Sequence, residues 1–362
     1  MKVGIIGAGQ LGRMLALAGH PLGLDFVFVD TSADAPGARV GALIPGRFDD
    51  PAVLGRLAEA SDIVTFDVEN VPEEAAWTVA ERVPFLPPPP ALGAGQDRLA
   101  EKRLFRSLDI PVADYGPVDG PDDLAAALER VGLPAVLKTR RLGYDGRGQQ
   151  MLQHPGDVEG AWERLGGVPA ILERFVRFDR ELSLVGVRSV SGETAFYPLS
   201  ENTHAGGILR RTRAPWEDPA LYDLAVGHLS SLMDHLAYAG VLTVEFFAVG
   251  KTLYANEMAP RVHNSGHWTI EGAATSQFEN HLRAILDLPL GSTEPLGHSG
   301  MVNFISRMPA ARDVLAIPHA HLHDYVKAPR PGRKLGHCTV VARTPEARDG
   351  ALAQVEHLIS ES

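Results

Sequence analysis

The sequence predicts a mixed chain of α/β and α+β modules, with a parallel sheet first and a small β-rich module last. Three observations support this prediction. Apolar strands alternate with helical patterns between Val3 and Phe66, which is typical of a parallel sheet covered by helices. Four prolines in a row, Pro87–Pro90, end that pattern, and short strands separated by turns follow Gly291. A chain of 362 residues is also too long for one ordinary hydrophobic core, so two or three domains are expected.

The first module begins with a short apolar strand at Val3–Ile6, followed by a glycine-rich turn and a helical pattern that starts at Arg13. Further strands are expected at Phe26–Val29 and Ile63–Phe66. Proline can neither pair within a central strand nor continue a helix, so the Pro87–Pro90 run is expected to be a stiff extended connector. It is the best candidate for a domain boundary.

The remaining elements are a helix and a series of strands. In order, they are expected at Gln96–Leu108 (helix), Ala135–Lys138, Val241–Phe247, Leu253–Met258, Val302–Ile305 and Thr339–Val341. The strand that ends at Lys138 leads into a second glycine-rich loop. The last two strands belong to the β-rich module that closes the chain.

Composition disfavours several functional classes. The formal net charge is −11, whereas binding duplex nucleic acid requires a cationic surface. No apolar run approaches the ~20 residues that a membrane-spanning helix needs. Met1 and Lys2 lead directly into the first strand without a signal-peptide pattern. Cys338 is the only cysteine, so no intramolecular disulfide is possible, and a cytoplasmic location is expected.

The first glycine-rich turn fits the dinucleotide-binding signature. Gly7, Gly9 and Gly12 follow a strand and precede a helix, and Asp30 ends the next strand, where a ribose-binding acid belongs. This pattern supports an NAD-dependent oxidoreductase. The same geometry suits any phosphate, because the glycines allow close backbone approach and the helix N-terminus supplies N–H donors. A sugar phosphate therefore remains an alternative ligand.

The second glycine-rich loop, Gly143–Gln149, follows the strand-end Lys138. A lysine beside a mobile glycine loop suits a clamp on a nucleotide polyphosphate, since the lysine adds charge and the loop can close over the oxygens. A surface hairpin with basic residues is the alternative. Arg98 and Lys102 share one face of the preceding helix and could add charge to the same anion, or could face solvent.

Two glutamates are expected to oppose each other across a hairpin. If Gly250 and Lys251 form the turn, Glu245 and Glu257 lie almost directly opposite, with Cβ atoms ~5 Å apart. Like charges at that distance repel, and Mg²⁺ bridging to substrate phosphates would compensate. Asn256 adds a further oxygen donor. Two glutamates splayed into solvent are the alternative, because the register is inferred.

In this order, these features resemble the N5-carboxyaminoimidazole ribonucleotide synthetases, ATP-grasp enzymes of purine biosynthesis. The resemblance covers nearly the whole chain, and four stretches carry it: Gly9–Met14, Gly143–Gln149, Asn256–Glu257 with Ala259–Trp268, and Arg330–His337. An oxidoreductase has no use for the last three. One departure is visible at Asp67-Val68-Glu69-Asn70, where relatives usually carry a glutamate in place of Asp67.

The resemblance implies an ATP-grasp architecture. It implies a Rossmann-like N-terminal domain at 1–94, an ATP-grasp domain at 95–300 with a lid at about 113–173, and a β-rich C-terminal module at 301–362. The implied enzyme is an ATP-dependent ligase that uses Mg²⁺ and works as a homodimer, while the composition argues against a nucleic-acid or membrane partner. It carboxylates 5-aminoimidazole ribonucleotide with bicarbonate through carboxyphosphate, which gives ADP and phosphate.

The resemblance also implies functions for single residues. The implied ATP-binding residues are Arg98, Lys138, Gly143, Tyr144, Asp145, Gly146, Arg147, Gly148, Gln149, Glu173, Arg174, Phe175, Val176, Glu181, His204, Asn256 and Glu257. The implied bicarbonate-binding and catalytic residues are Arg261, His263, Asn264 and Asp145, where Asp145 either orients the amine or accepts its proton. The implied residues for the amine substrate are Gln10, Tyr144, Asp145, Arg147, Arg333 and Lys334, and those for Mg²⁺ are Glu245 and Glu257.

Three rival functions remain from the sequence. The first is an NAD-dependent oxidoreductase that uses Gly7–Gly12, and the second is a catalytically silent nucleotide-binding protein. The presence of Lys138, Glu245 and Glu257 argues against the second. The third is an ATP-grasp ligase with another substrate, against which the distinctive Arg261–Trp268 stretch argues.

Overall fold

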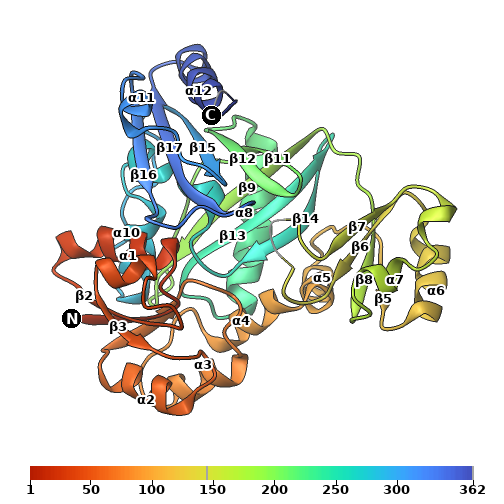
Figure 1. Ribbon diagram of the computed structural model, residues 1–362, viewed down its shortest axis with the longest axis horizontal. Helices are drawn as coiled ribbons and strands as arrows, with labels where there is room; N and C mark the ends of the chain where they lie inside the picture. Colours follow the sequence, from red (N-terminus) through yellow and green to blue (C-terminus); the bar gives the residue numbers. More distant parts are fainter. Residues whose placement is uncertain (144–145, 361–362) are drawn as a thin grey trace.

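A computed structural model describes residues 1–143 and 146–360. Over these residues the strands form three sheets: a four-stranded sheet at the start of the chain, a small four-stranded sheet, and a large nine-stranded sheet. Figure 1 shows the first sheet at the N-terminal end of the molecule and the small sheet projecting from the opposite side. The mixed α/β and α+β prediction is confirmed.

The first sheet is parallel, with the order β3-β2-β1-β4. Its elements are β1 (Lys2–Ile6), α1 (Gln10–Gly19), η1 (His20–Leu22), β2 (Asp25–Asp30), η2 (Pro36–Arg39), β3 (Ala42–Pro45), α2 (Pro51–Glu59), β4 (Ile63–Phe66) and α3 (Glu73–Ala80). The three strands predicted in this region are confirmed. Because the strands are parallel and covered by helices, their central residues are largely buried on both faces, and every residue of Ile63–Phe66 is buried.

The proline run is not an extended connector, and that prediction was wrong. Pro88 is the N-cap of α4 (Pro89–Gln96), so Pro89 and Pro90 begin a helix. Proline is well tolerated in a first helical turn, because the N–H groups there have no intrahelical partner. Asp97 then caps α5 (Arg98–Ser107) by accepting from the N–H groups of Leu99 and Ala100.

The small sheet is antiparallel, with the order β5-β8-β6-β7. It contains β5 (Tyr115–Val118), α6 (Pro121–Val131), β6 (Ala135–Thr139), β7 (Gln149–Leu152), η3 (Pro155–Asp157), α7 (Ala161–Arg164) and β8 (Ala170–Arg174). The helices α6 and α7 cover one face of this sheet (Figure 1). The second glycine-rich loop joins β6 to β7.

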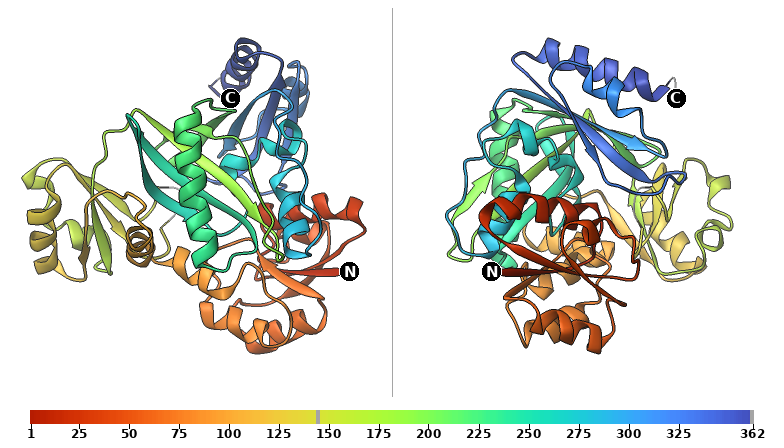
Figure 2. Two further views of the ribbon diagram at one scale, coloured as in Figure 1. Left: turned by 180° about the vertical axis from the view of Figure 1, so that it is seen from behind. Right: turned by 60° about the vertical axis from the view of Figure 1, so that its left-hand side comes forward.

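The large sheet has the order β14-β13-β9-β11-β12-β15-β17-β16, with β10 paired to β9. Its elements are β9 (Arg180–Arg188), β10 (Thr194–Phe196), β11 (Ser200–Ala205), β12 (Ile208–Ala214), α8 (Pro219–His235), β13 (Gly240–Val249), β14 (Thr252–Ala259), η4 (Asn264–Gly266), α9 (Thr269–Gly272), α10 (Gln277–Ile285), β15 (His298–Ile305), α11 (Ala311–Leu315), β16 (Ala320–Asp324), β17 (Lys334–Ala342) and α12 (Pro345–Ser360). Helix α8 lies across the back of this sheet (Figure 2).

The C-terminal strands are part of this large sheet. Strand β15 pairs with β12, from Arg211 opposite Val302 to Ala214 opposite Ser299, and then with β17. The β-rich character predicted for the end of the chain is confirmed. The pairing with β12 was not predicted, and it makes the last strands a continuation of the central body.

The first sheet is anchored to the central body through His281 on α10. The Nε2 atom of His281 lies 3.0 Å from the Thr65 hydroxyl, and its Nδ1 atom accepts from the Val241 N–H at 3.1 Å. His281 is fully buried. Among the described helices, none is both long enough and apolar enough to cross a membrane.

Candidate active site

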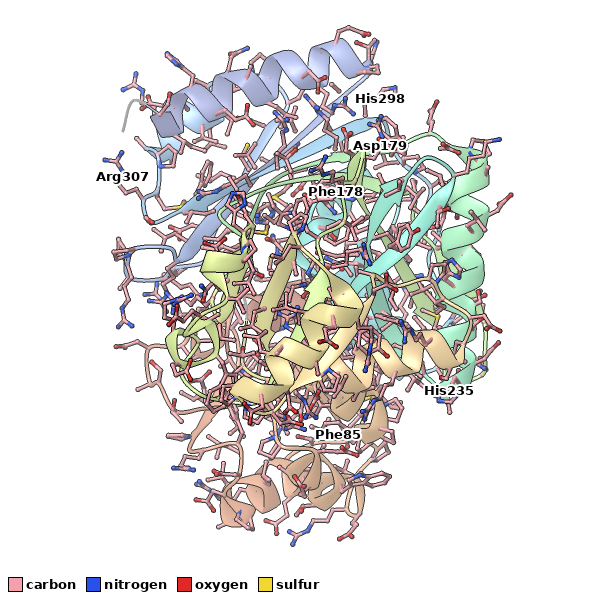
Figure 3. The ribbon with its side chains drawn as sticks, turned by 90° about the vertical axis from the view of Figure 1, so that its right-hand side faces the viewer. Phe85, Phe178, Asp179, His235, His298 and Arg307 are labelled. Atoms are coloured by element: carbon pink, nitrogen blue, oxygen red, sulfur yellow. The ribbon has the colours of Figure 1, made fainter. Side chains whose placement is uncertain are left out.

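One cleft of about 1180 Å³ is bounded by all three sheets. Its walls come from the loop after β4, from the small sheet with its glycine loop, from β13 and β14, and from the segment between β16 and β17. In Figure 3 the small sheet lies in front of the central body, and the labelled Phe178 lies where the chain passes from one sheet to the other. A cleft of this kind can hold a nucleotide and a second substrate together.

The structure brings most of the predicted site residues to this cleft. Those that line it are Gln10, Arg98, Lys138, Gly143, Gly146, Arg147, Gln149, Glu173, Arg174, Phe175, Val176, Glu181, His204, Glu245, Asn256, Glu257, Arg261, His263, Asn264, Arg333 and Lys334. Of the predicted residues that the structure describes, Gly148 alone lies outside the lining. A Cβ on Gly148 would lie 2.6 Å from Thr139 Oγ1. Tyr144 and Asp145 lie outside the described residues.

A buried ion cluster underlies the nucleotide side of the cleft. Glu173 Oε2 lies 3.1 Å from Lys138 Nζ and 3.4 Å from Lys102 Nζ. Burial alone would raise the pKa of Glu173, but the two ammonium groups outweigh it and lower the pKa to about 2. The carboxylate therefore stays ionised and holds Lys138 at the end of β6, where the lysine faces the cleft.

Lys102 lies in the cleft wall, but its charge is already engaged by partners within the protein. Its side chain is almost fully buried, and Nζ donates to the carbonyl oxygens of Ala255 at 3.1 Å and Asn256 at 2.6 Å. The alternative that it faces solvent is wrong. Sequence reasoning missed its structural use, because the partners are main-chain atoms far along the chain.

The paired glutamates do oppose each other, as predicted. Glu245 on β13 is the direct partner of Glu257 on β14, and the register shifts immediately beyond this pair. Phe246 pairs with Ala255, so Asn256 is the extra residue of a β-bulge. A regular ladder from the turn would pair Glu245 with Asn256, so the bulge moves the pairing by one residue.

Helix α5 holds this bulge on both sides. Lys102 binds the carbonyl groups before Glu257, and Glu101 accepts from the Met258 N–H after it at 2.7 Å. Arg98 Nη1 donates to Glu257 Oε2 at 3.0 Å, and Nη2 donates to the Gly143 carbonyl at 3.2 Å. One helix thus connects the glutamate to the glycine loop.

The donor set at the glutamate pair fits a hard divalent cation. Burial raises the pKa of Glu245, whereas Arg98 holds the pKa of Glu257 below its ordinary value against the effect of burial. The Oδ1 atom of Asn256 is buried and has no hydrogen-bond partner among the described residues. Two carboxylates and a nearby amide oxygen suit Mg²⁺ that also binds phosphate oxygens.

Four more of the predicted ATP-binding residues, Phe175, Val176, Glu181 and His204, lie at the end of β8 and on β9 and β11. Strand β8 ends at Arg174, so Phe175 and Val176 lie just beyond its end. Glu181 Oε2 lies 2.8 Å from His204 Nδ1. Burial alone would lower the pKa of His204, but Glu181 and Glu245 outweigh it and raise the pKa.

The three residues assigned to bicarbonate come from the segment after β14. Arg261 forms an ion pair of 2.5 Å with Glu69 of the N-terminal domain, a residue that the sequence reasoning did not assign to the site. His263 Nε2 lies 3.8 Å from Glu245 Oε1, and burial with the nearby Arg261 lowers the pKa of His263 to about 3. The Asn264 amide exchanges two hydrogen bonds with the Asn303 amide. A neutral imidazole and an oriented guanidinium suit a small anion.

The first glycine turn uses its donors within the fold. Asp30 accepts from the Ala8 N–H at 3.1 Å and from the Ser32 N–H, and Asp67 accepts from the Gly12 N–H at 3.0 Å. Asp30, the acid expected to bind a ribose, and the Gly12 N–H, a donor expected to bind a diphosphate, therefore both have partners within the fold. This geometry argues against the oxidoreductase alternative.

The basic segment between β16 and β17 faces this turn across the cleft. Lys327 donates to Gln10, and Arg333 Nη1 donates to the Ala328 carbonyl at 3.1 Å. Lys327 was missed in the sequence, although it precedes the assigned Arg333 and Lys334 by only a few residues. The available signal was the position of Lys327 in the same basic segment as Arg333 and Lys334.

Comparison with known proteins gives the family. Family models match the ribonucleotide synthetase preATP-grasp domain at residues 1–96, the ATP-grasp domain at 103–278, and the phosphoribosylaminoimidazole carboxylase C-terminal domain at 299–350. The N5-carboxyaminoimidazole ribonucleotide synthase of Pseudomonas aeruginosa is 51% identical over 99% of each chain. The Vibrio cholerae enzyme of the same name is 39% identical over 100% of this chain and 96% of its own.

Solved structures agree. The N5-carboxyaminoimidazole ribonucleotide synthetase of Thermus thermophilus superposes with a TM-score of 0.95 at 53% identity, over 99% of both chains. The Aspergillus clavatus synthase in complex with ADP and 5-aminoimidazole ribonucleotide has a TM-score of 0.93 at 32% identity, over 100% of this chain and 99% of its own. With relatives this similar over their full length, the chain belongs to the N5-carboxyaminoimidazole ribonucleotide synthase family of ATP-grasp ligases.

Proposed function

We propose that this cleft carboxylates 5-aminoimidazole ribonucleotide with ATP and bicarbonate, giving N5-carboxyaminoimidazole ribonucleotide, ADP and phosphate in purine biosynthesis. One observation carries the proposal. A single cleft contains the polyphosphate lysine Lys138, the opposed pair Glu245 and Glu257, and the anion-binding pair Arg261 and His263. Family membership fixes the ATP-dependent ligase chemistry that these residues serve.

The chemistry assigns a task to each group. A bicarbonate oxygen attacks the γ-phosphorus of ATP, ADP leaves, and carboxyphosphate forms. Carboxyphosphate then releases CO2 and phosphate beside the amine, and the amine nitrogen attacks the CO2 carbon and loses a proton. Arg261 matches the carboxylate edge of bicarbonate bidentately, and Glu69 fixes the guanidinium plane. Lys138 stabilises charge on the transferred phosphoryl group.

Glu245 and Glu257 would hold Mg²⁺, with Asn256 beside them. The ion supplies charge neutralisation on the ATP phosphates. Arg98 keeps the Glu257 carboxylate ionised and oriented, so the site is preorganised for a cation.

The division of labour follows the three modules. The N-terminal domain at 1–94 and the module at 301–362 hold the amine substrate, the ATP-grasp domain at 95–300 holds ATP, and the lid at about 113–173 closes over it. Gln10, Arg147, Arg333 and Lys334 bind the substrate from several sides, since all four line the cleft. The family resemblance adds Tyr144 and Asp145 to this set, and both lie outside the described residues. The single cysteine favours a cytoplasmic setting, and the family resemblance implies a homodimer.

The test is ADP formation from ATP and Mg²⁺, with bicarbonate and the amine substrate left out in turn. Rapid ADP formation should require both. Glu257→Gln should abolish turnover while its unfolding curve matches that of the parent protein. Undiminished Mg²⁺-dependent turnover in that variant would contradict the metal assignment. ADP formation at the same rate with and without the amine would contradict the proposed amine substrate.

A further inference from the structure

A buried amide lies directly behind the residues assigned to bicarbonate. Gln277, the first residue of α10, is fully buried and does not line the cleft. Its Oε1 atom accepts from the His263 N–H at 3.0 Å, and its Nε2 atom donates to the His263 carbonyl at 2.7 Å. The side-chain amide therefore hydrogen-bonds to both main-chain polar groups of His263, as a neighbouring strand would.

This contact is built closely into the local fold. The Gln277 N–H donates to Thr269 Oγ1 at 3.0 Å, and that hydroxyl donates to the Gly266 carbonyl at 2.7 Å. A Cβ on Gly266 would lie 2.7 Å from Gln277 Oε1, so a glycine is required for the amide to approach. The amide and the turn that follows His263 are thus fitted to each other.

The hydrogen bonds also fix the side chain that His263 presents to the cleft. Ser265 holds the imidazole at Nδ1, which lies 2.9 Å from the Ser265 hydroxyl and 3.3 Å from the Ser265 N–H. Nε2 faces Glu245 Oε1 at 3.8 Å. Without the two hydrogen bonds from Gln277, the His263 main chain could move, and the imidazole would move with it.

We propose that Gln277 is a positioning residue of the bicarbonate pocket, which holds the His263 main chain so that the imidazole meets the anion. This inference rests on the proposed function, because it takes His263 as a bicarbonate ligand. Gln277 does not line the cleft, so it would act on the anion through the His263 main chain, to which its two shorter hydrogen bonds go; its contact with His267 Nδ1 is longer, at 3.4 Å. Its loss should therefore weaken bicarbonate binding selectively and leave ATP binding intact.

Helix α10 supplies a matched control. Asn280 is also fully buried, and its amide grips the Gly291 main chain in the same way, accepting from N–H at 2.8 Å and donating to the carbonyl at 3.1 Å. Neither Asn280 nor Gly291 lines the cleft. Substitution at Asn280 thus reproduces the structural damage without the proposed effect on bicarbonate.

The most informative variant is Gln277→Glu. A protonated carboxyl can copy the amide, because one oxygen accepts from the His263 N–H and the other donates to the His263 carbonyl. An ionised carboxylate instead directs a negative oxygen at that carbonyl. The histidines that touch this position are His263 and His267, and burial lowers the pKa of both. Glu245, which lies 3.8 Å from His263, has a pKa that burial raises to about 7, but it is present in the parent protein as well. A ratio to the parent at each pH therefore isolates the titration of the introduced carboxyl.

The experiment measures the KM for bicarbonate and the KM for ATP between pH 6.5 and 8.5, as ratios to the parent protein at each pH. For Gln277→Glu the bicarbonate ratio should be roughly tenfold or more at the alkaline end and should shrink as the pH falls. The ATP ratio should stay near one throughout. Gln277→Met, which cannot form either hydrogen bond, should show the raised bicarbonate KM at every pH.

Several results would overturn the proposal. These are an unchanged bicarbonate KM in folded Gln277→Glu and Gln277→Met, equal effects on both substrates, or the same bicarbonate shift in Asn280→Asp. If neither Gln277 variant folds while Asn280→Asp does, Gln277 is required for folding and the proposal also fails. A parent protein whose turnover ignores bicarbonate would instead contradict the proposed function itself, which keeps the two failures distinct.

Discussion

Asp67 follows β4, and its carboxylate lies at the N-terminus of helix α1, where an external anion could otherwise bind. Oδ2 accepts from the Gly12 N–H, while Oδ1 is buried without a hydrogen-bond partner among the described residues. A Cβ on Gly7 would lie 1.8 Å from Oδ1, so this glycine makes room for the acid as well as adopting a φ of +98°. The Asp67 side chain therefore has a definite partner in the Gly12 N–H.

Asp67 predicts a specific pH dependence of stability. Burial raises its pKa from 3.8 to about 6, although the Gly12 N–H and Arg261 oppose the rise. A carboxyl with a raised folded-state pKa favours the fold most below pH 3.8, and this contribution is lost as the pH rises through 6. Relative to wild type, Asp67→Asn should gain stability between pH 4 and 6.5, by at most about 3 kcal/mol at 1.36 kcal/mol per pKa unit. Urea unfolding across this range measures it, and a pH-independent difference would contradict it.

Lys334 carries the prediction for the amine substrate. A charged hydrogen bond lost on truncation typically costs ~1.5–3 kcal/mol, which is roughly tenfold to a hundredfold in affinity. Lys334→Ala should raise the KM for the amine substrate by about that factor and leave the Kd for ATP unchanged. Steady-state kinetics with each substrate varied will show this, with the exposed turn residue Lys251→Ala as control. Weakened ATP binding with normal amine kinetics would move the basic segment to the nucleotide site.

Among the elements, the glycine loop meets one hairpin turn backbone to backbone. A Cβ on Gly207, between β11 and β12, would lie 2.4 Å from Gly146 Cα and 2.8 Å from Gly146 N. Both residues have positive φ, +75° and +76°. The turn is therefore a seat for the loop that follows Lys138.

Gly207→Ala should hold the glycine loop away from this seat. We expect kcat/KM for ATP to fall roughly tenfold or more, because small displacements of positioning groups cost large factors. Gly206→Ala is the control, since Gly206 also has a positive φ of +61° while no described atom lies within 4 Å of its Cβ position. Equal losses in the two variants would mean that backbone strain alone explains the effect.

The elements also show what sequence reasoning could reach. The near opposition of the two glutamates could be predicted, because a turn at Gly250 and Lys251 fixes the hairpin register to within one residue of the observed pair. The bulge at Asn256 could not, since the Lys102 and Glu101 contacts that hold it come from a helix far along the chain. Without the bulge, Glu257 would lie on the other face of the sheet. The helix at Pro89 was missed because a proline run reads as a breaker, whereas it suits a first turn.

At the scale of the whole molecule, buried neutral histidines join the modules and predict acid sensitivity. His281 links the N-terminal domain to the central body, and His267 and His337 pack together beside the cleft. Burial lowers the pKa of His281 to about 4 and lowers the pKa values of His267 and His337. The unfolded chain binds these protons near pH 6.5, so the stability they contribute is present above that pH and is lost as the pH falls toward 4.

The free energy of unfolding should therefore decline below pH 6.5, with close to one proton taken up on unfolding for each of these histidines near pH 5.5. Urea unfolding at a series of pH values gives the proton uptake from the slope. His281→Gln should reduce the slope by about one proton. A slope that is the same in wild type and in His281→Gln would show that other groups cause the acid sensitivity.

The pairing of β12 with β15 has a consequence for synthesis on the ribosome. The first sheet needs only early residues, so it can fold while the remainder is still being translated. Strand β12 must wait with an unpaired edge until β15 has emerged, long after its other neighbour, β11, is complete. An open edge of this kind can pair with other chains. A chain released by a ribosome that stalls before residue 298 would therefore be prone to aggregation, although all the strands that precede β15 have been synthesised.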